Sequence, residues 1–379
     1  MPRSDEEFPL LMIPGPTNLH PDVLRVMAEP QVAHTSHKFY SEFLEILELT
    51  KYVFQTDRSV IVFSGSGTSA MEAAACSVLE PGRKVLSLES GFFGKRFSTV
   101  AGLHGADVKT MAVPEGEAFD PADVDLELSR SSYDAVMITD VETSTGVENP
   151  VREIVSVARK HGALTLVDAV ASLGGCELAF DGWGIDVAFT ASQKAIAAPP
   201  GAALMALSDN AVQRLQERRS PISSYYYDLS RWLQVMKDPR IYLATPSTAA
   251  LRALRVALRL VKEEGIGNRI RRHRTLSDAF RRALEESGVE VFSKRPAPTM
   301  TALRVQDAPN VQKAVLEEHG VMVATGLSQR SKDLIRVGHM GNVDREQVYR
   351  TLDALFKVLK VEGRARPPVD GGGKPAAGS

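Results

Sequence analysis

The sequence predicts an α/β protein with a mostly parallel central sheet covered by helices, followed by a smaller domain of α+β type. Between residues 60 and 206, short apolar runs recur that show no alternation of apolar and polar residues. Such runs are typical of strands that are covered on both faces. Segments with helical spacing separate several of these runs, which is the order expected of parallel strands joined by helices.

This interpretation divides the chain into four segments. Residues 1–20 are expected to form an irregular arm, and residues 21–250 the large α/β domain. Residues 251–363 follow as the small C-terminal α+β domain, because helical segments and short strands are mixed there. The tail, residues 364–379, is rich in glycine, proline and alanine, so we expect it to be disordered.

Individual elements follow from the same patterns. In the large domain, the expected strands are residues 60–63, 84–88, 135–139, 163–167, 187–190 and 202–206. The expected helices there include residues 69–79 and a segment that starts at Pro150. A long helix over residues 247–264 is stopped by Gly265. In the small domain we expect helices at residues 268–286, 311–319 and 345–360, and strands at residues 290–292, 299–305 and 334–337.

Composition excludes several classes of function. The net charge of −2 gives no electrostatic basis for binding nucleic acid, and no apolar run is long enough to span a membrane. The first residues are acidic and lack the apolar core of a signal peptide. The cysteines, Cys76 and Cys176, have neither metal-ligand spacing nor the number that a disulfide framework requires. The resulting expectation is a cytoplasmic protein without a metal site.

Lys194 and Asp168 are the residues that point to chemistry. Lys194 lies in a segment whose nearest charges along the chain are Asp186 and Asp209, so we expect its amine to be buried. Burial lowers the pKa of a lysine and suits its amine to condensing with a carbonyl. Asp168 ends an apolar strand. A Schiff-base lysine and an aspartate that pairs with a pyridinium nitrogen are what pyridoxal 5′-phosphate (PLP) chemistry requires. The alternatives are a surface lysine with a buried stem and a helix-capping aspartate.

Glycine and hydroxyl residues suggest a place for the phosphate of such a cofactor. Residues 64–68 (SGSGT) follow an apolar strand and precede a helix, whose free N–H groups and dipole favour an anion. A glycine turn with a capped helix is the alternative. Residues 91–96 place Phe93 where an aromatic ring could stack on a planar cofactor or belong to the core. In residues 142–146, the hydroxyls could hold a cofactor or substrate oxygen, or cap a turn.

Arg336 is a candidate for binding a substrate. It lies inside the apolar strand of residues 334–337, and a buried guanidinium matches the two oxygens of a carboxylate. A structural salt bridge is the alternative. His37 and His339 lie near candidate site segments, and we expect both to be structural rather than catalytic.

Together these segments resemble the class V aminotransferases of PLP fold type I. The likeness is greatest to the group of alanine–glyoxylate and serine–glyoxylate (serine–pyruvate) aminotransferases, and it runs from about Pro14 to Lys360. The segments that carry it are residues 14–18, 64–68, 142–146, 167–175, 192–195, 199–201 and 336–338.

The resemblance implies a role for each candidate residue. Lys194 would form the internal aldimine with PLP, and Asp168 would meet the pyridinium nitrogen. Arg336 would bind the substrate carboxylate. The remaining cofactor contacts would be Ser66, Gly67 and Thr68 in the phosphate cup, Gln193 beside the lysine, Phe93 stacked on the ring where relatives often have tryptophan, and Thr143 near a cofactor oxygen.

The resemblance also implies a homodimer with shared active sites. Tyr242 and Thr245 match residues that reach the phosphate of the neighbouring subunit. The activity implied is ping-pong transamination of a small L-amino acid, alanine or serine, with a 2-oxo acid such as glyoxylate or pyruvate. Aspartate, phosphoserine or 2-aminoethylphosphonate are alternative amino donors. A cysteine desulfurase would need a cysteine in the C-terminal region, and none follows Cys176. The intact Lys194 argues against a non-catalytic protein of this fold.

Overall fold

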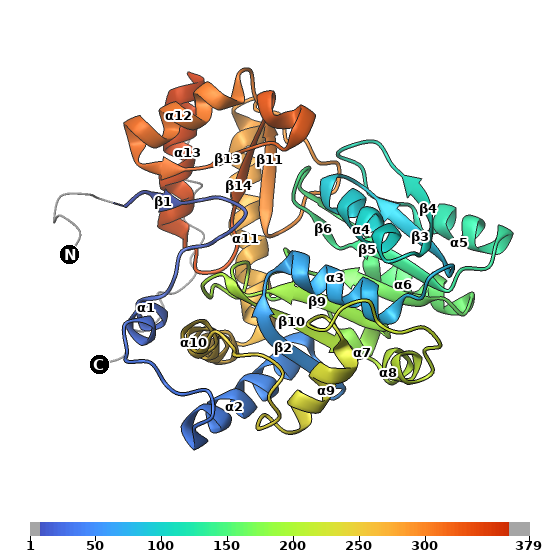
Figure 1. Ribbon diagram of the computed structural model, residues 1–379. Helices are drawn as coiled ribbons and strands as arrows, with labels where there is room; N and C mark the ends of the chain where they lie inside the picture. The colour runs from blue at the N-terminus through green and yellow to red at the C-terminus, as the bar shows by residue number, and fades with distance from the viewer. Residues whose placement is uncertain (1–7, 364–379) are drawn as a thin grey trace.

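The computed structural model describes residues 8–363, so the expected tail lies outside the described residues. A seven-stranded sheet forms the centre of the larger part (Figure 1). Only β10 runs antiparallel to its neighbours, which confirms the mostly parallel sheet. In spatial order the strands are β2 (Ser59–Gly65), β10 (Gly201–Leu207), β9 (Val187–Ala191), β8 (Leu164–Asp168), β5 (Ala135–Thr139), β3 (Lys84–Glu89) and β4 (Asp107–Ala112). The six expected strands are present, and β4 escaped prediction because it is a largely exposed edge strand with few apolar residues.

Helices cover both faces of this sheet because successive residues of each strand point to opposite sides. One face packs against α3 (Gly67–Val78), α4 (Phe92–Leu103), α8 (Asp209–Gln216) and α9 (Leu229–Lys237). The other face packs against α1 (Pro21–Met27), α2 (His37–Phe54), α5 (Pro121–Arg130), α6 (Val151–Lys160), α7 (Phe180–Trp183) and α10 (Thr248–Glu264). No helix within residues 8–363 combines the length and the apolar character needed to cross a membrane.

The smaller part has its own apolar core and an α+β arrangement. Its three-stranded antiparallel sheet has the order β11 (Met300–Arg304), β14 (Leu334–Gly338) and β13 (Ala324–Thr325). The helices beside it are α11 (Ile266–Glu286), α12 (Ala308–His319) and α13 (Arg345–Leu359), with a short 3-10 helix, η1, at Ser328–Lys332. The expected strand at residues 290–292 is wrong, because this segment pairs with β11 only through the bridge between Val291 and Leu303.

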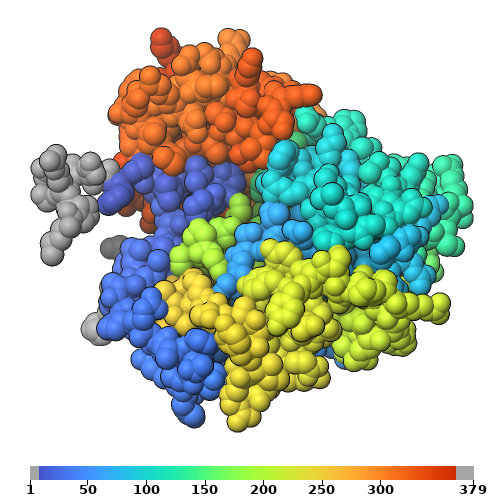
Figure 2. All heavy atoms as spheres, viewed as in Figure 1, coloured from blue at the N-terminus to red at the C-terminus, as the bar shows by residue number. Residues whose placement is uncertain are grey.

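The N-terminal segment, which the sequence predicts to be an irregular arm, contains one short strand. Strand β1 (Leu10–Leu11) pairs in parallel with β12 (Val321–Met322) of the small domain. The amide of Gly338, at the end of β14, donates to the carbonyl of Met12 at 2.9 Å. In Figure 2 this segment lies in dark blue between the small domain and the rest of the molecule. The chain start therefore joins the small domain to the lysine-bearing loop of the large one.

The expected domain boundary between residues 250 and 251 falls inside α10. The buried residues Leu251, Leu254 and Leu258 belong to the same core as α2 and the large sheet. Helix α10 ends where predicted, with Gly265 as its C-cap at φ +79°, and α11 starts directly after it. We therefore propose Gly265 as the boundary, because the packing changes from the large core to the small one at this turn.

Candidate active site

The candidate site lies at the carboxyl edge of the large sheet. Asp168 is the last residue of β8, and Gln193 and Lys194 lie in the turn that follows β9. Strands β8 and β9 are parallel neighbours, so their carboxyl ends bring these residues to the same edge. Ligands of open α/β sheets bind at this edge.

Lys194 is covered by the N-terminal segment. Its Nζ donates to the carbonyl oxygen of Pro14. Gly15 has φ +92°, and a Cβ there would lie 2.7 Å from Lys194 Cδ, so glycine is required for this close approach. Burial lowers the pKa of Lys194 to about 8, with a further lowering from the positive charge of Arg336 and an opposing effect of Asp168. The amine is therefore partly neutral near neutral pH.

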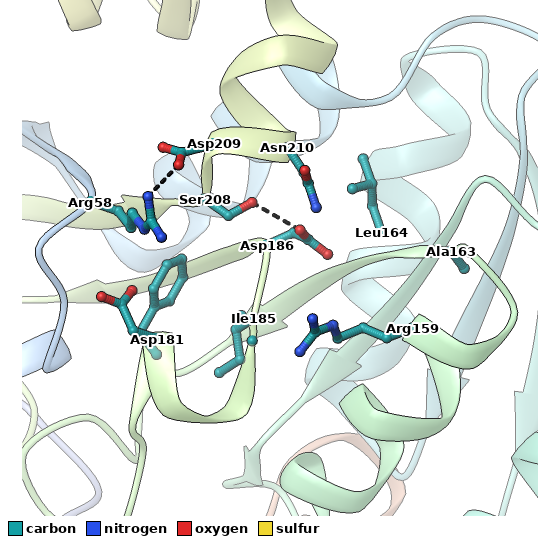
Figure 3. Close-up of a pocket in the computed structure, with 13 residues that line it drawn as sticks. Arg58, Arg159, Ala163, Leu164, Asp181, Ile185, Asp186, Ser208, Asp209 and Asn210 are labelled. Carbon is teal, nitrogen blue, oxygen red and sulfur yellow. Dashed lines mark hydrogen bonds and ion pairs between the residues drawn. The ribbon is translucent and has the colours of Figure 1, made fainter.

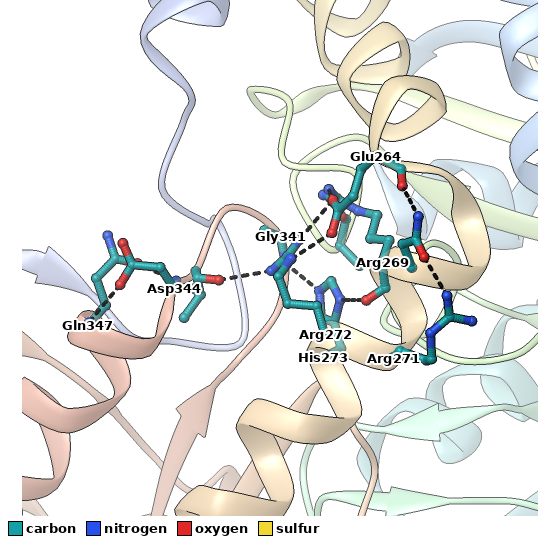
Figure 4. A network of polar contacts seen from close by, with 11 residues as sticks. Glu264, Arg269, Arg271, Arg272, His273, Gly341, Asp344 and Gln347 are labelled. Atoms are coloured by element: carbon teal, nitrogen blue, oxygen red, sulfur yellow. Dashed lines mark hydrogen bonds and ion pairs between the residues drawn. The ribbon is translucent and has the colours of Figure 1, made fainter. Parts of the chain in front are cut away.

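A partly buried network of charged residues, shown around Glu264, Arg269 and Arg272 in Figure 4, reaches the backbone next to Lys194. Arg269 of α11 donates to the carbonyl of Ala195 at 2.6 Å. Glu264 lies within 2.6 Å of Arg269 and 2.7 Å of Arg272, and Arg272 also donates to two carbonyls of the loop after β14. The sequence analysis missed these residues, because charges in an arginine-rich helix usually lie on a solvated face. The network links the lysine loop to the small domain.

Asp168 is a buried carboxylate with few partners. Its Oδ1 accepts from the amide of Val170 at 2.9 Å, and no cationic nitrogen within residues 8–363 lies within 4.0 Å of it. Burial raises its pKa to about 7; the hydrogen bond from Val170 lowers it and the charge of Glu142 raises it further. An acid in this position is suited to a cationic ligand.

The phosphate-cup candidate is the start of α3. Ser66 is the N-cap and forms a reciprocal capping box with Ser69. In the part of the chain that the structure describes, the amides of Gly67 and Thr68 have no acceptor. A Cβ on Gly67 would lie 2.7 Å from Val170 Cγ2, so this glycine allows α3 to approach the segment after Asp168. The structure thus brings the cup and the aspartate together.

Glu142, for which the sequence predicted no separate role, positions Phe93. Phe93 is half-buried in the first turn of α4. The carboxylate of Glu142, in β6 (Val141–Glu142), accepts from the amides of Phe93 at 2.9 Å and Gly94 at 3.1 Å. Its other oxygen accepts from the amide and the hydroxyl of Ser144. Glu142 therefore caps α4 from another element. In residues 142–146 the sequence had indicated a role only for the hydroxyl groups.

Arg336 reaches the site from β14. Its Nε donates to the carbonyl of Thr325 at 2.7 Å and its Nη1 to the carbonyl of Thr143 at 3.0 Å. The side chain of Thr143 is itself buried. No carboxylate among the described residues is ion-paired with Arg336, so the structural salt bridge considered above does not form. Burial lowers the pKa of Arg336 to about 10, and the charge of Glu142 opposes this.

Some predicted residues lie apart from this cluster. Tyr242 and Thr245 are exposed, and their hydroxyls are 3.1 Å from each other. His37 is exposed at the start of α2. His339 is buried, with its Nε2 at 2.9 Å from the hydroxyl of Thr301, and burial holds its pKa well below the usual range. The arrangement of His339 is that of a structural histidine.

A cavity of about 470 Å³ lies at the opposite edge of the sheet (Figure 3). It is lined by Leu164 at the start of β8 and by Asp186 just before β9. Asp186 accepts from the hydroxyl of Ser208 at 2.8 Å. Because the cavity meets the amino ends of these strands, it is separate from the site around Asp168. Within residues 8–363, no cluster of His, Cys, Asp and Glu is arranged to hold a metal ion.

A mostly parallel sheet with a half-buried lysine and a buried aspartate and arginine at its carboxyl edge defines an enzyme of PLP fold type I. The chain belongs to the class V aminotransferase family, which it matches over residues 14–348. The resemblance predicted from the sequence is confirmed, and the protein is an aminotransferase.

Three similar proteins show how far the likeness extends. The chain is 36% identical to an uncharacterised aminotransferase of Methanocaldococcus jannaschii over 363 residues, 93% of each chain. It is 33% identical to the alanine–glyoxylate aminotransferase of Callithrix jacchus over 362 residues, 93% of this chain and 87% of that one. The crystal structure of an alanine–glyoxylate aminotransferase from Nostoc sp. superposes with a TM-score of 0.91 at 35% identity, covering 95% of this chain and 97% of that one.

Proposed function

We propose that this aminotransferase moves an amino group between a small L-amino acid, alanine or serine, and a 2-oxo acid such as glyoxylate or pyruvate, with PLP as its cofactor. One observation carries the proposal: the buried Asp168 and Arg336 and the half-buried Lys194 meet at one edge of the sheet. The names of the alanine–glyoxylate relatives support this class of substrates.

The residues present offer suitable partners for three groups of PLP: the phosphate, the ring nitrogen and the aldehyde. The unbonded amides of Gly67 and Thr68 suit the phosphate, because they open the N-terminus of α3. The buried carboxylate of Asp168 has no cation, and the ring nitrogen of PLP can provide one. Gln193 has a buried Oε1 without a donor. The amine of Lys194 is the group that would bond to the aldehyde.

The remaining cofactor contacts are proposed in the same way. Ser66, at the N-cap of α3, would complete the phosphate cup. Phe93 would lie against the ring, and Thr143 would approach a cofactor oxygen. When bound, PLP supplies an electron sink for the charge that develops on the amino acid.

Lys194 and Arg336 would carry out the work on the substrate. A lysine with a pKa of about 8 is near the pH at which it must both accept and return a proton, which suits general acid–base catalysis at the α-carbon. Arg336 still has N–H groups that can donate to a substrate carboxylate, since its protein partners are only two backbone carbonyls. Its fixed guanidinium would hold the α-carbon within reach of the Lys194 amine.

Arg330 of η1, which lines a cavity together with Ser144, supports a substrate with a small, uncharged side chain. Aspartate and phosphoserine carry a second anionic group that needs a cation of its own. Arg330, in η1, is already engaged by Glu115 at 2.6 Å and by Asp333 at 2.9 Å. With Arg330 engaged, Arg336 would serve the α-carboxylate, which supports alanine or serine over these donors and over 2-aminoethylphosphonate, which lacks a carboxylate.

A cysteine desulfurase activity is not supported by the cysteines. Cys76 and Cys176 are both buried. Burial raises the pKa of the Cys76 thiol to about 11 and that of Cys176 well above its ordinary value. Neither thiol is therefore a ready nucleophile.

We further propose that the active enzyme is a homodimer with shared sites. Tyr242 is 67% exposed and Ile241 45% exposed, so these adjacent side chains are available for contact with a second chain. The hydroxyl pair of Tyr242 and Thr245 is available to a phosphate held by a second chain. A cytoplasmic location remains a prediction from the sequence.

Labelling and a substrate panel test the proposed function. Borohydride reduction of the PLP-loaded protein followed by peptide mapping should place the pyridoxyl group on Lys194. Alanine and serine should then be the best amino donors when glyoxylate, pyruvate and 2-oxoglutarate are offered as acceptors. A label on another lysine would refute the cofactor assignment. Strong preference for aspartate, phosphoserine or 2-aminoethylphosphonate would refute the substrate assignment alone.

A further inference from the structure

Arg96 is a cation without an anionic partner beside the candidate cofactor site. It lies in the first turns of α4, and its Nη1 donates to the hydroxyl oxygen of Thr68 at 3.0 Å. Its guanidinium carbon is 4.8 Å from the centre of the Phe93 ring. Thr68 is its only hydrogen-bond partner within residues 8–363, and no carboxylate there lies within 4.0 Å.

Two sources of positive potential therefore meet at the start of α3. One is the N-terminus of this 12-residue helix, where the amides of Gly67 and Thr68 have no acceptor in the described chain. The other is the guanidinium of Arg96. Burial raises the pKa of Asp168, and the positive charge of Arg96 opposes this rise.

The hydrogen bond from Arg96 determines what the Thr68 hydroxyl can do. A hydroxyl has one donor and two acceptor positions. Because Arg96 occupies an acceptor position on Oγ1, the hydrogen of the hydroxyl is left to be donated elsewhere. Thr68 is exposed at the helix start, so this donor is available to an anion at the same place.

The contact with Phe93 gives Arg96 a second effect. A guanidinium over an aromatic face is attracted by the ring quadrupole. Since Glu142 already holds the backbone of Phe93, Arg96 restrains the remaining freedom, which is the orientation of the ring. Arg96 thus connects the phosphate cup on α3 with the stacking candidate on α4.

We propose that Arg96 is a positioning residue for the cofactor, acting on the phosphate through the Thr68 hydroxyl and on the ring through Phe93. The inference rests on the proposed function, because it takes PLP as the ligand. Arg96 would raise affinity for the phosphate group and orient the ring, without being required for the fold.

The experiment compares Arg96→Met and Arg96→Lys with the control Lys95→Met, which alters the exposed neighbouring cation. Cofactor-free protein is titrated with PLP and, separately, with inorganic phosphate alone, and binding of each is followed by isothermal titration calorimetry. Visible circular dichroism of the loaded protein reports ring orientation. Arg96→Met should weaken binding of both ligands about tenfold and reduce the dichroic signal. Arg96→Lys should recover part of the affinity, and Lys95→Met should match the wild type.

A double-mutant cycle with Thr68→Val separates this role from a merely structural one. If Arg96 acts through the hydroxyl, the effects of Arg96→Met and Thr68→Val on phosphate affinity should be less than additive. The unfolding temperature of cofactor-free Arg96→Met should stay within about 2 °C of the wild type. Unchanged affinities, full additivity, or a fall in stability that lysine does not rescue would each overturn the proposal. Failure of wild-type protein to bind PLP would instead refute the proposed function, while the inorganic phosphate titration would still test Arg96.

Discussion

At the candidate site, burial shifts the pKa values of the half-buried Lys194 and of the buried Asp168 and Arg336 in the direction that favours the neutral form. Burial lowers the pKa of Lys194 to about 8 and that of Arg336 to about 10, and it raises that of Asp168 to about 7. In each case removal from water disfavours the charged form. A ligand that places an opposite charge beside each of these groups would lower the free-energy cost of its charged form. The same displacement makes Lys194 able to exchange a proton near neutral pH.

Asp168 allows this cost to be measured in the cofactor-free protein. Its pKa of about 7 lies above the ordinary value of 3.8, so the unfolded chain releases its proton first as the pH rises. The destabilisation by Asp168 is therefore absent below pH 3.8, grows as the pH rises toward 7, and is constant above that. Asp168→Asn keeps an oxygen for the Val170 amide but removes the charge.

We expect Asp168→Asn to reduce the fall in stability between about pH 4 and pH 7, by at most about 4 kcal/mol in the free energy of unfolding. Urea unfolding of cofactor-free protein at several pH values measures this. Asp57→Asn, at an exposed site, should leave the profile unchanged. The loaded Asp168→Asn enzyme should lose activity by orders of magnitude. Identical stability profiles of wild type and Asp168→Asn would contradict the assignment of a buried, unpaired carboxylate.

At the scale of elements, α4 depends on a cap that comes from outside the helix. Its N-cap, Gly91, has no side chain to accept a hydrogen bond, and Glu142 of β6 takes this role. Glu142→Gln replaces one of the two carboxylate oxygens with an NH2 group, which cannot accept a hydrogen bond. At least one of the backbone amides that Glu142 binds therefore loses its acceptor. We expect a loss of about 1–3 kcal/mol in unfolding free energy. Thermal or urea unfolding checks this against Glu153→Gln on the exposed face of α6; equal stability of the two variants would show that Glu142 is no cap.

Elements that are marked by a local sequence pattern were predictable from the sequence. Each apolar strand of the large sheet is a short buried run: β2, β3, β5, β8, β9 and β10. Asp168 ends one of these runs, and Lys194 lies shortly after another. Contacts between distant segments were not predictable. Glu142 capping α4, Arg269 holding the lysine loop and β1 pairing with β12 join residues far apart in the chain, and no local pattern marks them.

At the scale of the whole molecule, the candidate site is assembled from both domains and the N-terminal segment of residues 8–20. Asp168 and Lys194 come from the large domain, Arg336 from the small domain, and Pro14 from the segment between them. The Arg269 and Arg272 network crosses the same junction. Movement of the small domain would therefore displace Arg336, the proposed substrate-binding arginine, relative to Lys194. The exposed Tyr242 and Thr245 extend this assembly beyond one chain in the proposed dimer.

Complementation between two inactive chains tests the shared site. A chain with Lys194→Ala keeps Tyr242 and Thr245, whereas a chain with Tyr242→Phe and Thr245→Ala keeps Lys194. In a mixed dimer, one site combines Lys194 with an intact Tyr242 and Thr245 from the partner. At limiting PLP, co-folded mixtures should therefore regain activity beyond the average of the two parents.

The control replaces the Lys194→Ala chain with one that carries all three substitutions. Its mixed dimers contain Lys194 only beside a partner without the two hydroxyl contacts, so we expect no gain, whatever the expression or folding of the chains. Recovery in both mixtures would mean that dimer formation alone restores activity. Recovery in neither, when mixed dimers are shown to form, would mean that Tyr242 and Thr245 do not act across the interface. A stable and fully active monomer would remove the need for a second chain altogether. Only recovery confined to the first mixture requires that the phosphate be held by the hydroxyls of one chain while the lysine belongs to the other.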